Sequence, residues 1–287
     1  MIPSMTDFLF ELLQPKRFTH VVDIGANPID GPAPYLPLLQ KRLCRVTGFE
    51  PQREAFEELN AKKSDLENYL PYAVGDGSMS DFHICAYPGF SSLLKPSSEA
   101  LSVFSEFIPN ASILEIEKIQ THRLDDIQEL SNFDFLKIDV QGSELSVFKN
   151  AKQHLSHVVA VQLEVSFVAL YENQPTLGRV DLFLRQAGFV PHSFVAVKHW
   201  KMGSVATASQ IYNQLLEADM VYIKDLISPL ISNEQLKQLA MVLHHVYQSH
   251  DAVGRCISIL QERGALGTSC LDDYVLYLNS EYQPSHP

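Results

Sequence analysis

The chain has 287 residues, a mass of 32.3 kDa and a formal net charge of −12 at pH 7. Hydrophobic residues make up 46% of it and charged residues 20%, which is the composition of an ordinary globular protein rather than a disordered one. The acidic balance argues against the broad basic face of a nucleic-acid-binding protein and against docking on anionic lipid.

The first residues carry acids ahead of the first basic residue and have no long apolar core, so they do not resemble a secretory signal. No apolar run approaches the ~20 residues that a membrane span requires. The four cysteines, at positions 44, 85, 256 and 270, form no C-x-x-C pair and are interpreted as free thiols. We therefore expect a soluble, cytoplasmic protein.

From about residue 20 onward, short β-rich runs alternate with helical patterns, as in βαβ units. The β-rich runs predict strands at 20–26, 45–51, 68–75, 134–140, 158–167, 189–197 and 218–225. The helical patterns predict helices at 34–43, 52–64, 143–154 and 176–187. We expect an α/β fold in which helices cover both faces of a mostly parallel sheet.

Residues 77–121 interrupt this alternation after the third predicted strand. They predict an extra strand at DFHICAYP, a turn-rich loop at GFSSLLKPSS, a short helix and a further strand near ILEIEKIQT. An insertion at this place commonly forms a lid or a substrate wall, because loops above a rigid sheet tend to carry specificity.

The pattern changes again after the last predicted strand. We place a boundary near residue 226, between a domain of residues 1–226 and a small helical extension of residues 227–287. The extension predicts two amphipathic helices, the first capped by Ser232 or Asn233 and the second closed by Gly264.

The turn after the first predicted strand, in HVVDIGANPIDG, is of the kind that receives a nucleotide-like cofactor. Gly25 lets a ligand approach the backbone, and Asp23, two residues earlier, points to the same side. The G-x-G-x-x-G fingerprint is absent, since Asn27 and Pro28 replace the later glycines. Pro28 has no amide hydrogen to donate to a phosphate, so the loop suits a pyrophosphate poorly.

Glu50, in GFEPQ, ends the second predicted strand, where a carboxylate can accept both hydroxyls of a ribose. Nicotinamide and S-adenosylmethionine sites share that feature. One glycine, no phosphate cradle and a ribose-binding acid together favour an adenosine ligand without phosphates, of which S-adenosylmethionine is the common one. Two alternatives stay open: an NAD-dependent oxidoreductase, and a non-catalytic binding or scaffold protein.

The segments VVDIGAN, FEP, YAVGD, GFSSLL, FLKIDVQGSEL, VQLEVSFVALYENQP and ADMVYIKD follow one another in the order seen in FkbM-type methyltransferases. The chain resembles this family over roughly residues 18–225, and LKIDVQGSELSVFKNA is the most specific segment. The resemblance implies a class I Rossmann-like methyltransferase fold, S-adenosylmethionine as methyl donor, and usually oxygen methylation of a glycan or secondary metabolite. The sequence departs from the family after Asn27, where PIDGPAPY replaces a shorter glycine turn.

The motifs and the resemblance together give a set of candidate cofactor-binding residues: Asp23, Gly25, Asn27, Glu50, Pro51, Ala73, Val74, Asp76, Ser92 and Asp139. Asp76 would reach the adenine amino group, with Ala73 and Val74 lining the ring. Ser92 matches the family's glycine-serine segment and either closes over the ligands or belongs to a plain polar turn.

Asp139, Glu164 and His192 are the candidate catalytic residues. Methyl transfer from a sulfonium is an in-line displacement, which needs alignment first and a base only if the acceptor keeps its proton. Asp139 either pairs structurally with Lys137, since an unpaired buried charge is costly, or lies beside the methyl group, as the family match implies. Glu164 would take the acceptor's proton, grip its hydroxyls or cap a loop. His192 suits proton transfer near neutrality, although a lone strand histidine is more often structural.

The histidines give no metal-binding pattern. His244 and His245 point about 100° apart on one predicted helix, and no H-E-x-x-H or paired Cys/His motif occurs, so we predict no metal. The expected partner is a small-molecule or glycan acceptor, not nucleic acid or a membrane. The C-terminal helices could also mediate a homodimer by burying their apolar stripes against a second copy.

Overall fold

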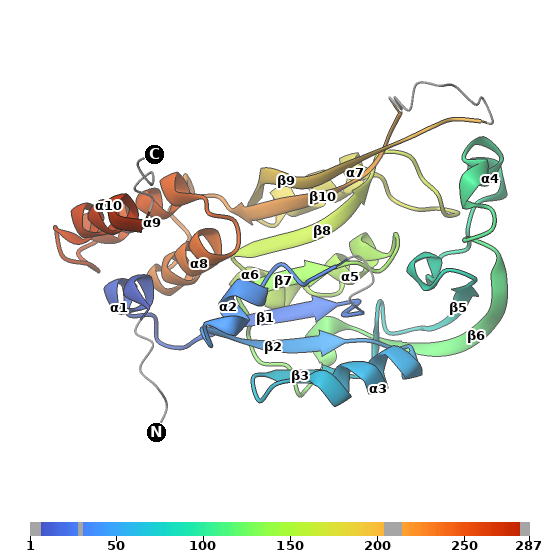
Figure 1. Ribbon diagram of the computed structural model, residues 1–287, viewed down its shortest axis with the longest axis horizontal. Coiled ribbons are helices and arrows are strands. Elements are labelled where there is room, and N and C mark those ends of the chain that lie inside the picture. The colour runs from blue at the N-terminus through green and yellow to red at the C-terminus, as the bar shows by residue number, and fades with distance from the viewer. Residues whose placement is uncertain (1–6, 28–30, 204–213, 282–287) are drawn as a thin grey trace, which may run out of the picture.

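The computed structural model describes residues 7–27, 31–203 and 214–281, and its centre is a seven-stranded sheet of order β3-β2-β1-β7-β8-β10-β9 (Figure 1). Neighbouring strands from β3 to β8 pair in parallel, and β10 is antiparallel to both β8 and β9. The strands are β1 Thr19–Ile24, β2 Cys44–Phe49, β3 Glu67–Leu70, β7 Phe135–Ile138, β8 Ala160–Ser166, β9 Phe189–Trp200 and β10 Gln214–Lys224. The predicted mostly parallel sheet is confirmed.

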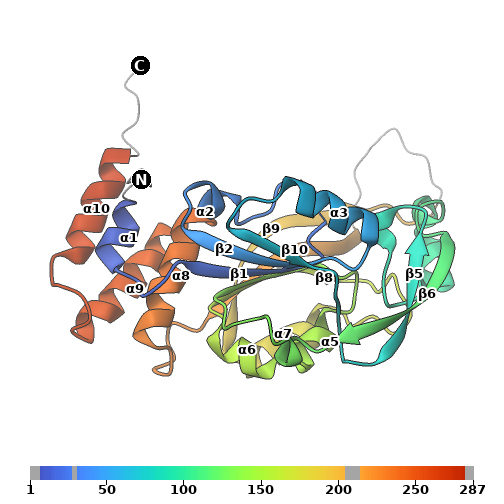
Figure 2. The same ribbon diagram turned by 90° about the horizontal axis from the view of Figure 1, so that it is seen from below.

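Helices cover both faces of this sheet (Figure 2). On one face lie α2 Leu36–Gln40 and α3 Arg53–Lys62, and on the other lie α5 Glu144–Lys149, α6 Lys152–His157 and α7 Leu177–Gln186. The central strands β1, β7 and β8 are mostly apolar because both of their faces are buried, whereas the edge strands β3 and β9 are partly exposed. Val21 and Phe135 belong to the core on one side, whereas Val22 and Leu136 belong to the core on the other.

The helix predicted over 143–154 is broken in two. The side chain of Asn150 donates to the carbonyl of Ser146 at 2.9 Å, and Asn150 caps α5 outside helical geometry. Asparagine offers the backbone such alternatives to helical bonding, so the chain turns here before α6 begins.

The strand predicted over 68–75 is also divided. Its first half is β3, and its second half, β4 Ala73–Val74, belongs to a separate sheet of order β4-β6-β5 with β5 Met79–Cys85 and β6 Ile113–His122. Pro71 stands between the halves and has no amide hydrogen for a sheet ladder. The inserted segment also contains η1 Pro88–Phe90, α4 Ser98–Val103 and η2 Ser105–Phe107, and η3 Leu124–Asp126 follows it. Both strands predicted inside the insertion are confirmed.

The chain ends are helical: α1 Phe8–Leu13, α8 Asn233–His245, α9 His250–Glu262 and α10 Cys270–Glu281. Ser232 caps α8 in a reciprocal capping box with Gln235, and Gly264 follows α9 with φ +66°, as predicted for the two helix ends. The sequence analysis did not predict α1, which Asp7 caps, or α10.

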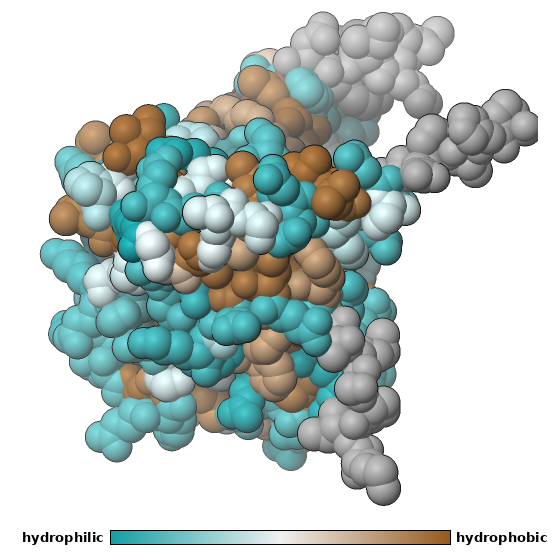
Figure 3. All heavy atoms as spheres, turned by 90° about the vertical axis from the view of Figure 1, so that its left-hand side faces the viewer, coloured by the Kyte–Doolittle hydropathy of each residue, from teal (hydrophilic) through white to brown (hydrophobic). Residues whose placement is uncertain are grey.

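The helices α1, α2, α8, α9 and α10 share one hydrophobic core with the sheet residues Val21, Phe135 and Val221. They gather at the end of the molecule where β1 and β2 begin, opposite the inserted sheet (Figure 1). Figure 3 looks onto this end, where apolar side chains lie in several separate groups among polar ones.

The apolar stripes of α8 and α9 are therefore buried within the chain itself. The boundary near residue 226 and the homodimer stay predictions, and light scattering would test the latter. In the described ranges, no helix combines the length and the apolar character needed to cross a bilayer.

Candidate functional site

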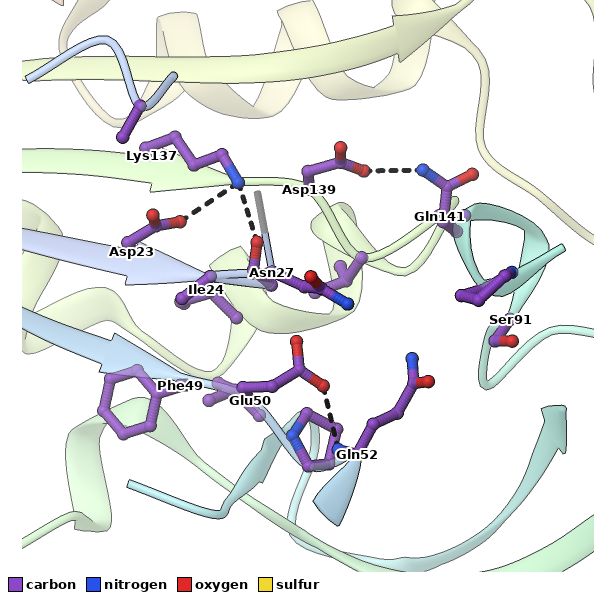
Figure 4. Close-up of a pocket in the computed structure, with 18 of the residues that line it drawn as sticks. Asp23, Ile24, Asn27, Phe49, Glu50, Gln52, Ser91, Lys137, Asp139 and Gln141 are labelled. Carbon is purple, nitrogen blue, oxygen red and sulfur yellow. Dashed lines mark hydrogen bonds and ion pairs between the residues drawn. The ribbon is translucent and has the colours of Figure 1, made fainter. Parts of the chain in front are cut away.

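A cavity of about 360 Å³ lies where β1, β2 and β7 end (Figure 4). The carboxyl ends of parallel strands are where ligands bind in open α/β sheets. Eight of the predicted site residues line it: Asp23, Gly25, Asn27, Glu50, Pro51, Ala73, Val74 and Asp139. The inserted segment supplies one wall through Pro88, Gly89, Ser91 and Leu93. Pro28, by contrast, lies outside the described residues.

Gly25 is the point at which two strand ends meet. Its φ is +77°, and a β-carbon placed on it would lie 1.9 Å from the carbonyl oxygen of Asp139. The amide groups of Gly25 and Ala26 both donate to the carbonyl of Phe49, at 3.0 and 3.1 Å. Only glycine lets the turn after β1 press against the end of β7 in this way.

Asp23 is held in a buried polar network on the floor of the cavity. The Lys137 ammonium lies 3.1 Å from one carboxylate oxygen of Asp23, and Tyr35 donates to the other at 2.8 Å. Lys137 also donates to the carbonyl of Gly25 at 2.8 Å. Burial raises the pKa of the Asp23 carboxyl. Burial alone would lower the pKa of Lys137, but the Asp23 and Asp139 carboxylates raise it above its ordinary value.

This arrangement corrects one of the two expectations for Asp139, its structural pairing with Lys137, because Lys137 forms its ion pair with Asp23. Asp23 and Lys137 are register partners on the paired strands β1 and β7. Side chains directly opposite each other on neighbouring strands are closer than side chains two residues apart on one strand. Asp139 is consequently left to other contacts.

Glu50 lies at the tip of β2 and is only 3% exposed. Its carboxylate accepts the backbone amide of Gln52 at 2.8 Å, and Figure 4 shows it directed toward Asn27. Burial raises the pKa of Glu50 to about 7. Hydroxyl groups that donated to this carboxylate would stabilise its charged form.

Asp139 follows β7 and faces the cavity from the other side of Gly25. Its backbone amide donates to the carbonyl of Ile24 at 2.9 Å, and its carboxylate accepts the side-chain amide of Gln141 at 2.7 Å. The sequence analysis missed Gln141, although a polar side chain directly after the strand was a usable signal.

Two predicted cofactor residues are not brought to this cavity. Asp76 lines a separate hollow beside Thr121, and its carboxylate accepts the amide and the hydroxyl of Ser78 at 2.9 and 2.6 Å. Ser92 is buried behind the wall and donates to the carbonyl of Gln141 at 2.7 Å, so that Ser91 lines the cavity in its place.

Glu164 and His192 also lie outside the cavity lining. The Lys198 ammonium bridges Glu164 at 2.8 Å and Glu217 at 3.0 Å. Burial, together with the neighbouring carboxylates, raises the pKa of Glu164. His192 shares a hydrogen bond of 2.8 Å with Ser249, at the start of α9, and its pKa is lowered by burial.

The far end of the cavity is formed by Gln162 from β8, Asp219 from β10 and Val195 from β9. Gln162 could have been found from the sequence, because it lies two residues before Glu164 and therefore points to the same face of β8. Asp219 and Val195 had no such signal, since the antiparallel pairing of β10 decides which of their side chains face the cavity. Within the part of the chain that the structure describes, no cluster of three His, Cys, Asp or Glu side chains is placed to hold a metal ion.

The family model for the methyltransferase FkbM domain matches residues 23–191, from the end of β1 into β9. No curated protein matches the sequence. Among solved structures, the chain is similar to magnesium protoporphyrin IX methyltransferase from Synechocystis PCC 6803, with 10% identity, 73% and 71% of the two chains covered and a TM-score of 0.37. It is also similar to precorrin-6y C5,15-methyltransferase from Geobacter metallireducens GS-15, with 10% identity, 75% and 85% covered and a TM-score of 0.37. At TM-scores this low, only the family match bears on function.

Proposed function

Because this chain belongs to the FkbM methyltransferase family and is an S-adenosylmethionine-dependent methyltransferase, we propose that it methylates a hydroxyl of a sugar or another small-molecule acceptor. The predicted family and class I Rossmann-like fold are confirmed, with five parallel strands followed by an antiparallel hairpin. Membership of this family excludes the alternative of an NAD-dependent oxidoreductase. The cytoplasmic location stays a prediction.

The cavity residues fit S-adenosylmethionine, which supplies an activated methyl group when bound. Glu50 would accept the ribose hydroxyls, because its buried carboxylate has a free face toward the cavity. Ala73 and Val74 offer an apolar edge for the adenine ring. At the turn of Gly25 and Asn27, the missing side chain of Gly25 lets the cofactor lie close to the backbone at the centre of the site.

The polarity of the far end supports a hydroxyl acceptor. Asp139 and Asp219 present carboxylate oxygens that accept hydrogen bonds, whereas the side-chain oxygen of Gln162 already accepts the Tyr247 hydroxyl at 3.0 Å. The Lys137 ammonium, which also lines the cavity, forms its ion pair with Asp23. A hydroxyl group is a hydrogen-bond donor, so it would be oriented here and not repelled.

One observation carries the proposal: two carboxylates, Glu50 and Asp139, flank the glycine turn from opposite sides in one cavity. Glu50 suits the nucleoside of the cofactor. Asp139 is then left for the reacting end, where it would orient the acceptor oxygen or take its proton during the displacement.

The test uses deuteromethyl S-adenosylmethionine and a panel of neutral sugars, phenols and amines. Mass spectrometry detects the transferred label, and NMR distinguishes an oxygen-bound from a nitrogen-bound methyl group. We expect oxygen methylation of at least one hydroxyl compound and its loss in Asp139→Asn. Label found only on nitrogen would contradict the acceptor class. Calorimetry with S-adenosylhomocysteine is run beside NAD. If S-adenosylhomocysteine does not bind, the result favours the alternative of a non-catalytic scaffold protein.

A further inference from the structure

Gln141 occupies an unusual backbone position between β7 and α5. Its φ is +52°, in the left-handed region, and the following Gly142 has φ +99°. Glycine adopts such angles without strain, whereas other residues adopt them at a cost and tend to do so at functional sites. Gln141 therefore occupies a backbone conformation that glycine adopts most easily.

Three polar atoms of Gln141 take part in hydrogen bonds. Its side-chain nitrogen donates to the Asp139 carboxylate at 2.7 Å, as Figure 4 shows, and its side-chain oxygen accepts the Tyr171 hydroxyl at 3.2 Å. Its backbone oxygen accepts the Ser92 hydroxyl at 2.7 Å. Three separate parts of the chain thus meet at one residue: the end of β7, the loop after β8 and the inserted segment.

The orientation of the amide follows from its neighbours. A carboxylate can only accept, so the nitrogen end of Gln141 must face Asp139 and the oxygen end must face Tyr171. The Tyr171 hydroxyl lies 3.2 Å from both the Gln141 side-chain oxygen and the carbonyl of Phe90, and it can donate to either. Reversing the amide would place an oxygen against the carboxylate.

Tyr171 is itself fixed from behind. It is 3% exposed, and Gln174 accepts the backbone amides of Leu170 and Tyr171 at 2.7 and 3.2 Å. Gln174 also donates to the Ser166 hydroxyl at the end of β8, at 2.7 Å. The loop therefore reaches Asp139 through a rigid chain of bonds that ends at Gln141.

We infer that Gln141 is a positioning residue that holds the carboxylate of Asp139 toward the reacting end of the cavity, with Tyr171 supporting the oxygen end of its amide. The inference rests on the proposed function, in which Asp139 faces the transferred methyl group. Gln141 also lines the cavity, so the test has to separate positioning of Asp139 from a direct contact with the cofactor.

The test compares two probes that bind without turnover. S-adenosylhomocysteine has an uncharged sulfur at the reacting position, whereas sinefungin has an amine there, which is protonated near neutral pH. The ratio of their dissociation constants in calorimetry therefore reports how well a negative charge is placed at that position. No acceptor is needed for the measurement.

In Gln141→Met and in Tyr171→Phe, the preference for sinefungin over S-adenosylhomocysteine is expected to fall about three- to tenfold, as for a weakened hydrogen bond to a charged group. The affinity for S-adenosylhomocysteine itself should change less than about twofold. Gln186→Met and Tyr87→Phe are the matched controls, since both side chains lie outside the cavity lining and neither ratio should move. Thermal melting checks that each variant is folded.

The outcomes separate the inference from the function on which it rests. An unchanged ratio in both variants, with S-adenosylhomocysteine still bound, overturns the positioning role alone. Loss of S-adenosylhomocysteine binding in both folded variants also overturns it, because Gln141 would then hold the cofactor directly. If the unaltered protein binds neither probe, the proposed function fails and the inference fails with it.

Discussion

The position of a β-carbon on Gly25 lies 1.9 Å from the carbonyl oxygen of Asp139, so the two strand ends that flank the site touch backbone to backbone. No side chain fits between them without moving one strand end. The turn after β1 therefore packs directly against the backbone that carries the Asp139 carboxylate.

Gly25→Ala is therefore expected to destabilise the protein by more than about 1 kcal/mol and to abolish S-adenosylhomocysteine binding, because it adds both a collision and a positive φ. Gly178→Ala is the matched control. A β-carbon at Gly178 meets nothing within 4 Å, and alanine favours the helix α7 in which it lies. Equal melting temperatures and affinities for the two variants would contradict the close approach.

Glu50 predicts a pH dependence of cofactor binding. Its pKa in the free protein is about 7, and ribose hydroxyls that donate to the carboxylate would lower that value in the complex. A group that loses its proton on binding makes affinity rise with pH, until the pH exceeds the pKa of the free protein. Affinity for S-adenosylhomocysteine should thus increase severalfold from pH 6 to pH 8.

Glu50→Gln should bind more weakly and lose this dependence, which calorimetry at three pH values would show. Gln52→Glu, with its side chain near the same wall, tests whether added charge alone reproduces the effect. The ribose role is wrong if Glu50→Gln keeps the slope of the unaltered protein.

The sequence could predict the sheet and the position of the site because these depend on local patterns. The apolar runs of β1, β2 and β7 mark their own ends, and Gly25, Glu50 and Asp139 stand directly at those ends. The start of helix α8 could be predicted in the same way, since Ser232 and Gln235 form its capping box within four residues.

The contacts that these residues make could not be predicted from the sequence, because they depend on strand register and on packing between distant parts of the chain. Lys137 meets Asp23 through strand pairing rather than through sequence proximity. Lys198 reaches Glu164 only because the β9–β10 hairpin folds back on β8. Tyr171 meets Gln141 across thirty positions of sequence. Long-range contacts of this kind decide which of several polar side chains enter the site.

Glu144 predicts a pH dependence of stability. It is buried at the start of α5, accepts the amides of Val140 and Gly142 at 3.1 Å each, and has a pKa raised by burial to about 7 from an ordinary 4.5. The folded state therefore binds the proton more tightly than the unfolded state. Its contribution to stability is fully present below about pH 4.5 and is lost as the pH rises toward 7.

The side chain in Glu144→Gln cannot ionise, so the variant should lack this contribution to the pH dependence of stability. We expect the melting temperature of the variant, relative to that of the unaltered protein, to rise between pH 5 and pH 8. Glu54→Gln on α3 serves as the control, since that residue is exposed and no such change is expected. A constant difference in melting temperature across this range would show that Glu144 does not titrate there.

The contacts of Lys198 predict a loss of stability when the carboxylates near the acceptor end of the cavity lose their cation. It bridges Glu164 and Glu217, and its removal in Lys198→Met would leave two neighbouring carboxylates without their shared cation. We expect a loss of about 1–3 kcal/mol in the free energy of unfolding, less than for a fully buried pair because the Lys198 side chain is 35% exposed. Denaturant titration measures the loss.

The double variant Lys198→Met with Glu164→Gln separates charge from packing. If repulsion between carboxylates causes the loss, neutralising Glu164 should restore most of the stability at neutral pH, and the two changes will be strongly non-additive. If the double variant is no more stable than Lys198→Met alone, repulsion between the two carboxylates does not cause the loss. High salt should narrow the gap only in the first case, since screening acts on the charges.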